Sequence, residues 1–119
     1  MKAEFLPEAE DEFIEAARYY EGAAPGVGFR FIAEVHRCLG FVSEHPLAAP
    51  EKKGVRKKLL NHFPYNLLYA VETDLIVVVA VAHQKRRPGY WRSRVKKVKD
   101  LAGRFIGEDS QPYEPAGGD

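Results

Sequence analysis

The sequence has little of several features that define common protein classes. Cys38 is the only cysteine, which excludes an internal disulfide framework and a zinc site built from cysteines, and makes a reducing, cytoplasmic compartment the expectation. No apolar run is long enough to span a bilayer, and no basic start followed by an apolar core marks a signal peptide. A Gly-rich phosphate loop, a nucleotide-binding fingerprint and a Ser-His-Asp signature are also missing. We therefore expect no cofactor, no metal and no membrane partner.

Size and charge narrow the possibilities further. A chain of 119 residues with 45% hydrophobic content is expected to form one small globular domain. Its net charge of +1 conceals a strong asymmetry, because residues 1–24 carry seven acids and two bases, whereas residues 83–104 carry nine bases and one acid. Such asymmetry indicates an anionic or acidic partner for one surface.

Two apolar runs predict a β-hairpin around which the rest of the chain is organised. Residues 65–71 and 75–82 flank the short polar connection Glu72-Thr73-Asp74. The second run is apolar on both faces, as expected of a strand in the middle of a sheet. Cations and aromatic residues follow at once: His83, Lys85, Arg86, Arg87, Tyr90, Trp91, Arg92 and Arg94.

The first half of the chain predicts a short strand and two helices. Residues 2–6 read as the strand, and Pro7 then opens a helix whose early acids favour the positive end of the helix dipole. Apolar residues at helical spacing form its buried face, and we interpret the acidic run as its solvated face. A second helix, from about Pro25 to about His45, is stopped by Pro46. The link between the helices is short, which predicts an antiparallel pair.

A further strand is predicted over residues 55–62. Its alternation places Arg56 and Lys58 on one face and Lys57 on the other. These cations either protect an edge strand and keep it soluble, or join the cations after His83 in one patch. From about Arg104 the composition turns to Gly, Pro, Glu, Asp and Ser, which predicts a flexible tail over residues 104–119 after a domain of residues 1–103.

The predicted order is strand, helix, helix and three strands, or β-α-α-β-β-β. This order indicates a small α+β domain in which a helical hairpin packs on one face of a mostly antiparallel sheet.

With these elements in order, residues 1–95 resemble the RelE/ParE superfamily of bacterial toxins from type II toxin-antitoxin modules, especially its ParE, or plasmid-stabilisation, branch. The residues that carry the resemblance are the opening strand and Pro7-led acidic helix, Gly54-Val55-Arg56, Phe63-Pro64-Tyr65 with Tyr69, and His83 followed by Arg86, Pro88, Tyr90, Trp91 and Arg94. The resemblance implies a cytoplasmic growth inhibitor neutralised by a cognate antitoxin. Residues 96–119 depart from the usual short ending of the family.

The resemblance implies one of two activities. RelE-like members are ribosome-dependent endoribonucleases that cleave mRNA, and here the catalytic candidates are Arg56, Lys58, His83, Arg86 and Tyr90. ParE-like members instead inhibit DNA gyrase by binding it, and the target-binding surface is then Arg56, Lys58, Arg86, Arg87, Tyr90, Trp91 and Arg94.

The same residues also have structural interpretations, as alternatives to RNA cleavage and to gyrase binding. His83 ends a buried strand, Tyr90 and Trp91 are placed to seal the sheet end, and Arg94 is placed to pair with the acidic first helix. We favour a gyrase-binding toxin. The alternatives are the ribosome-dependent endoribonuclease and an inactive member that retains only antitoxin binding.

Overall fold

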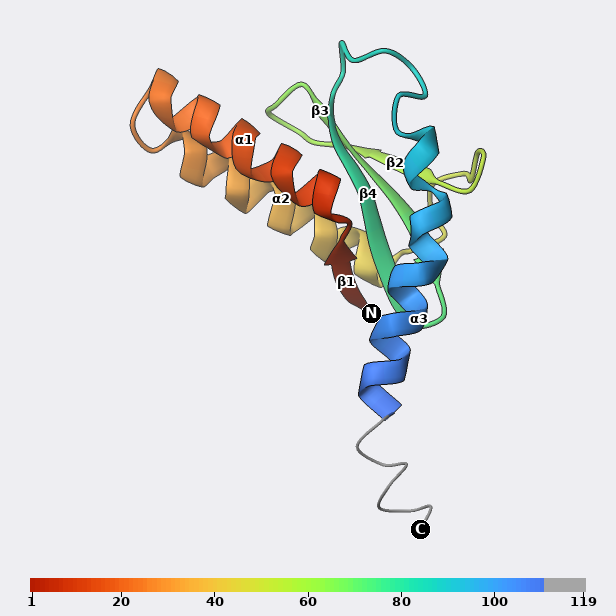
Figure 1. Ribbon diagram of the computed structural model, residues 1–119. Helices are drawn as coiled ribbons and strands as arrows, with labels where there is room; N and C mark the ends of the chain where they lie inside the picture. The colour runs from red at the N-terminus through yellow and green to blue at the C-terminus, as the bar shows by residue number, and fades with distance from the viewer. Residues whose placement is uncertain (111–119) are drawn as a thin grey trace.

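The protein has the α+β architecture that its sequence predicts, with one further helix at the end. The computed structural model describes residues 1–110, and their side chains as far as Arg104 (Figure 1). Its elements are β1 (Lys2–Phe5), α1 (Pro7–Ala23), α2 (Val27–Glu44), β2 (Arg56–Leu59), β3 (Tyr65–Glu72), β4 (Leu75–His83), the 3-10 turn η1 (Arg92–Arg94) and α3 (Lys96–Ser110).

The strands form one mixed sheet in the order β1-β4-β3-β2. β3 and β4 are antiparallel and are joined at Thr73 and Asp74, where Asp74 adopts the left-handed φ of 58°. β2 is antiparallel to β3, whereas β1 is parallel to β4 and begins with Lys2 opposite Leu75. The predictions of a central hairpin strand and a mostly antiparallel sheet are therefore confirmed. Every residue of β4 except His83 is buried, as its unbroken apolar run requires.

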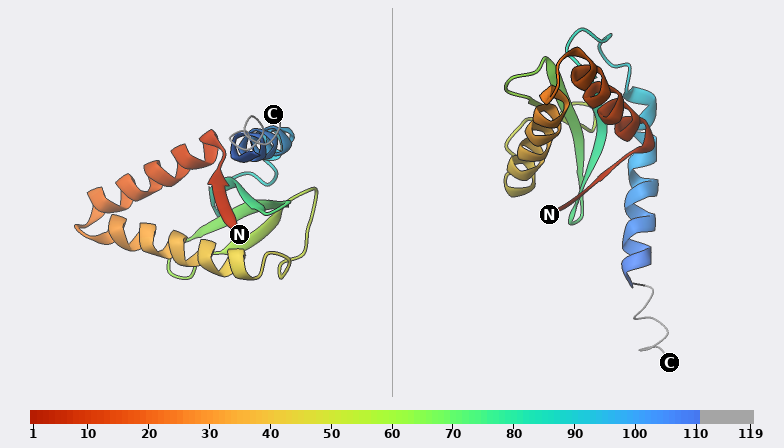
Figure 2. Two further views of the ribbon diagram at one scale, coloured as in Figure 1. Left: turned by 90° about the horizontal axis from the view of Figure 1, so that it is seen from below. Right: turned by 90° about the vertical axis from the view of Figure 1, so that its left-hand side faces the viewer.

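The antiparallel helices α1 and α2 cover one face of the sheet (Figures 1 and 2). Phe31 of α2 is fully buried at the centre of an aromatic cluster, with its ring centroid 5.2 Å from those of Phe63 and Tyr65 and 5.4 Å from that of Tyr20. The helices approach closely near their connection, where a Cβ atom on Gly28 would lie 2.6 Å from the Ala17 carbonyl oxygen. Only glycine fits there without a shift of the backbone.

α3 covers the lower part of the opposite face and was not predicted. Val98 and Ala102 belong to the same buried cluster as Ala70, Leu75 and Val77, and the helix then continues past the end of the sheet (Figure 1). Residues 104–110 of the predicted tail belong to this helix, and residues 111–119 lie outside the described part of the chain. No helix within residues 1–110 is both long and apolar enough to cross a membrane.

Candidate functional site

A cation-rich groove opens beside loop 84–92, on the sheet face that the helical pair does not cover. It has a volume of about 460 Å³ and lies between residues 50–57, the upper ends of β3 and β4, and the loop itself. No Asp or Glu lines it, whereas seven cations do: Lys52, Lys53, Arg56, Lys57, Arg86, Arg87 and Arg92. Low-dielectric walls lined by one sign of charge concentrate the field, so this groove attracts anions.

The floor of the groove is apolar but closed. Leu68 and Ala82 are each 5% exposed, and both belong to a small buried cluster against which Tyr90 and Trp91 pack. The surface that a ligand meets therefore combines the cationic side chains with the partly exposed Tyr90 and Trp91.

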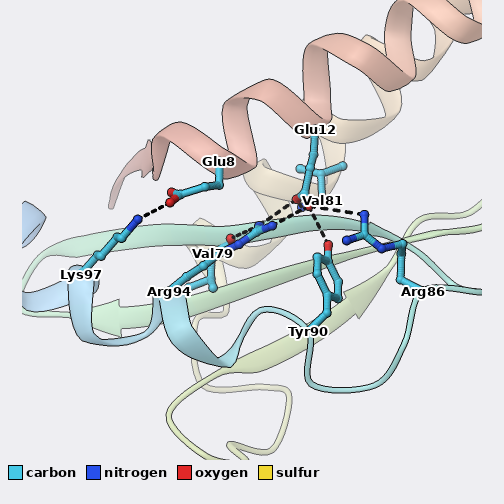
Figure 3. A network of polar contacts seen from close by, with 8 residues as sticks. All are labelled: Glu8, Glu12, Val79, Val81, Arg86, Tyr90, Arg94 and Lys97. Atoms are coloured by element: carbon cyan, nitrogen blue, oxygen red, sulfur yellow. Dashed lines mark hydrogen bonds and ion pairs between the residues drawn. The ribbon is translucent and has the colours of Figure 1, made fainter.

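The loop that forms one wall of the groove is held in place by Glu12 of α1 (Figure 3). Arg94 donates to both carboxylate oxygens, at 3.0 and 2.9 Å, and the Tyr90 hydroxyl donates to Oε2 at 2.8 Å. The guanidinium of Arg86 lies 3.9 Å from Oε2 and 3.8 Å from the centroid of the Tyr90 ring. With side chains only 15% and 14% exposed, Glu12 and Arg94 form a partly buried, bidentate ion pair.

The backbone explains why a carboxylate and a guanidinium are needed at this point. β1 pairs with β4 only as far as Val78, whose carbonyl accepts the last bond from Leu6. Beyond it, the Val81 N–H donates to Glu12 Oε1 at 3.0 Å, and the Val79 carbonyl accepts from Arg94 at 3.0 Å. Side chains thus satisfy the buried backbone groups of β4 where β1 has ended.

The sequence interpretation of Glu12 as part of a solvated helix face is wrong. Ala9 and Ala16 are both buried, and Glu12 lies three residues after the first and four before the second, which puts it on the same face of α1. Its charge is compensated by Arg94, so burial is tolerated. The position of Glu12 between Ala9 and Ala16 on the apolar face of the helix is the sequence signal that predicts its burial.

Arg56 lines the groove with a side chain that is largely buried, and Lys58 does not line it. In the register of β2 with β3 they stand opposite Tyr69 and Leu67, on the helix-covered side of the sheet. The Arg56 side chain is 16% exposed and donates to the Ala49 carbonyl oxygen, and the Lys58 amine lies 4.8 Å from the centroid of the Phe41 ring on α2. The structure therefore does not bring Lys58 into one patch with the cations after His83.

His83 and Tyr90 are also engaged within the fold. The ring of His83 contacts that of Tyr65 at 5.1 Å, and its Nδ1 accepts the Lys85 N–H at 3.0 Å. With Nδ1 accepting, a neutral ring carries its proton on Nε2. The pKa of Tyr90 is raised, first by burial and then by the hydrogen bond to Glu12, so its hydroxyl stays protonated.

Three lysines of the groove were not among the predicted site residues. Lys52 and Lys53 lie on the tight turn that precedes β2, where Gly54 has a φ of 87°, and Lys57 is an exposed residue of β2 that lines the groove. The alternation of β2 separates Lys57 from Lys58 but does not say which of them faces the helices. Only the packing of β2 against the rest of the sheet decides this.

Comparison with known proteins identifies the family. Residues 3–88 match the family described as ParE toxin of type II toxin-antitoxin system, parDE, and the chain therefore belongs to this family. A solved structure described as the chromosomal ParDE TA system from P. aeruginosa contains a chain of the same fold, with a TM-score of 0.60 and 15% sequence identity. The alignment covers 70% of this protein and 95% of that chain. A search of curated proteins gives no match.

Proposed function

We propose that this ParE-family protein inhibits growth by binding DNA gyrase through the surface formed by loop 84–92, and that a cognate antitoxin neutralises it in the cytoplasm. The observation that carries the proposal is the groove itself, with seven cations and no acid along its lining. Arg86 has a side chain that is 51% exposed, and Arg87 lies beside it on the same loop. Such a surface is suited to contact with a large, acidic target.

The state of the candidate catalytic residues supports binding over RNA cleavage. Cleavage requires a general acid and a general base within reach of one phosphate, with pKa values near the working pH. Here the Tyr90 hydroxyl is bound to Glu12, the His83 ring contacts Tyr65, and Lys58 lies over Phe41 on the other face. These groups do not converge on a single point in the groove.

Two labelled precursors separate the two activities. The protein is induced in a bacterial host without antitoxin, while incorporation of thymidine and of amino acids is followed in pulses. Early loss of DNA synthesis with filamenting cells is the expected result. A fall in amino-acid incorporation within minutes, ahead of thymidine, would overturn the proposal in favour of the endoribonuclease.

A pair of variants links the effect to the loop. Arg86→Gln combined with Arg87→Gln is expected to reduce inhibition of DNA supercoiling by purified gyrase at least about tenfold, because two exposed contacts are lost. His83→Gln is the control and is expected to retain activity. Thermal unfolding of both variants shows that the fold survives. Loss of activity in His83→Gln with an intact fold would contradict the binding mechanism.

Exposed apolar side chains on the helical pair support the antitoxin proposal. Ile14, Tyr19, Phe29 and Phe41 are between 40% and 72% exposed, and all four lie on α1 or α2. A helix or extended segment of the antitoxin is expected to bury them. Co-expression with the product of the neighbouring reading frame tests this, and the expected result is a stable complex that abolishes growth inhibition. A growth defect unchanged by a well-expressed neighbour would contradict it.

A further inference from the structure

We propose that the cationic groove binds the phosphate backbone of duplex DNA, so that the protein recognises the DNA held by its target enzyme as well as the enzyme. The biological setting rests on the proposed function, because gyrase works on DNA. DNA binding by the isolated protein is a separate property that is measured without gyrase.

The groove has charge that the fold does not neutralise. Arg56 lies 3.7 Å from Glu51, and Arg86 lies 3.9 Å from Glu12. Within residues 1–104 no ion pair is found for the other five cations of the lining, Lys52, Lys53, Lys57, Arg87 and Arg92. Cations that lie close together repel one another, and binding of a phosphate backbone reduces this repulsion. Binding also releases the counterions condensed on the DNA.

The closed floor favours phosphates over an acidic peptide. Tight protein–protein contacts depend on a few apolar or aromatic anchors that enter open pockets. Leu68 and Ala82 are buried beneath Tyr90 and Trp91 and are not available as apolar anchors, whereas seven cations and no acid line the groove. Its recognition is therefore mainly electrostatic, as for a backbone that carries charge at every residue and no apolar side chains.

The aromatic residues favour a duplex over a single strand. Binding of single strands relies on bases that stack on open aromatic rings. The guanidinium carbons of Arg86 and Arg94 lie 3.8 and 5.0 Å from the centroid of the Tyr90 ring, and Trp91 packs on the buried cluster below. The Tyr90 ring is therefore already contacted by two guanidinium groups, and Trp91 is only partly exposed.

Fluorescence anisotropy with a labelled duplex of about 20 base pairs tests the proposal, because phosphate contacts are salt-dependent. For five contacts, log Kd is expected to change with log salt with a slope of about 4.5, which weakens binding about 500-fold between about 50 and 200 mM salt. The net charge of the chain is only +1, so attraction through total charge is small and the signal reports the groove. A single-stranded RNA of equal length and an oligoglutamate peptide are the comparison ligands.

Two adjacent residues of β2 provide a matched pair of variants. Lys57 lines the groove, whereas Lys58 lies on the other face above Phe41. Lys57→Gln is expected to weaken duplex binding about 3- to 10-fold and to lower the salt slope by about 1, as for the loss of one phosphate contact. Lys58→Gln makes the same change in charge and is expected to leave the affinity for the duplex and the salt slope unchanged. Lys53→Gln with Arg87→Gln is expected to lower the slope by about 2.

Four outcomes would overturn the inference. These are no duplex binding at low salt, equal losses in the Lys57 and Lys58 variants, tighter binding of the RNA than of the duplex, and displacement of the duplex by oligoglutamate at equal charge. Gyrase inhibition is scored separately. Salt-dependent duplex binding without inhibition of supercoiling would support the DNA-binding inference and overturn the proposed function. Inhibition of supercoiling without duplex binding would support the proposed function and overturn the DNA-binding inference.

Discussion

The two faces of the sheet use similar side chains for different purposes. On the face covered by α1 and α2, aromatic rings surround the fully buried Phe31, and the Lys58 amine lies over the Phe41 ring. On the other face α3 covers only the lower part, and the upper part is the cationic groove. Neighbouring lysines of one short strand thus belong either to the packing or to the exposed surface, according to the direction in which each points.

The largest expected loss of stability comes from the helix-covered face. Phe31→Ala removes a fully buried ring that contacts Tyr20, Phe63 and Tyr65, and is expected to lower the free energy of unfolding by about 4 kcal/mol. Val98→Ala, on the buried side of α3, is expected to cost about 1 to 2 kcal/mol, because it removes less buried apolar volume. Urea unfolding measures both. Equal costs would show that the two faces contribute alike to the core.

The next largest expected loss of stability comes from Glu12, which connects α1 to loop 84–92. Glu12→Gln removes the negative charge opposite the partly buried Arg94 and weakens the support of Tyr90, with an expected cost of about 2 to 3 kcal/mol. Glu15→Gln on the exposed side of the same helix is the control and is expected to change stability by less than about 0.5 kcal/mol. Similar urea midpoints for the two variants would show that the loop does not depend on Glu12.

A smaller, pH-dependent effect is expected from Glu34 on α2. Its pKa is lowered, first by the hydrogen bond from the Asn61 N–H at 2.9 Å and then by Arg37, with His62 3.7 Å away. A native pKa below the ordinary 4.5 means that the stabilisation is present above that pH and is lost as the pH falls through the native value.

Glu34→Gln is accordingly expected to cost about 1.5 kcal/mol at pH 7 and to lose less stability on acidification than the parent protein, because the contribution of Glu34 is already absent. Thermal unfolding between about pH 7 and pH 3 compares it with the parent protein and with Glu15→Gln, which keeps the parental acid sensitivity. An unchanged slope in Glu34→Gln would assign the acid sensitivity to other groups.

The smallest effect separates the two adjacent lysines of β2. Lys58→Gln removes the cation above Phe41 and is expected to cost about 0.5 kcal/mol, whereas Lys57→Gln is expected to leave stability unchanged. Chemical unfolding under identical conditions measures the difference. A larger cost for Lys57→Gln would mean that this lysine belongs to the packing, and would reverse the assignment of the two faces.

Much of the fold follows from periodicity in the sequence. The unbroken apolar run ending at Ala82 predicts the central strand, and helical spacing from Phe31 to Val42 predicts α2, because these patterns are local. α3 was missed although Val98, Leu101 and Ala102 already show helical spacing, since the Gly- and Pro-rich residues further on dominated the interpretation.

The candidate site was less predictable because it depends on contacts between distant segments. Arg86, Arg87 and Trp91 lie at the groove as expected, but the groove also takes lysines from the turn before β2. The partner of Glu12 is set by where β1 stops pairing with β4, and no local pattern encodes that position. Pairing of Arg94 with the acidic helix was proposed as a structural role, and the structure confirms it.

The pairing of Glu12 with Arg94 also affects the order in which the chain folds during its synthesis. The two residues are 82 positions apart, and β1 finds its neighbour only when β4 has been made. The helical hairpin has local contacts and is able to form early, whereas the closing contacts come last. An incomplete nascent chain therefore has no assembled groove, because the groove forms only after nearly the whole domain has emerged.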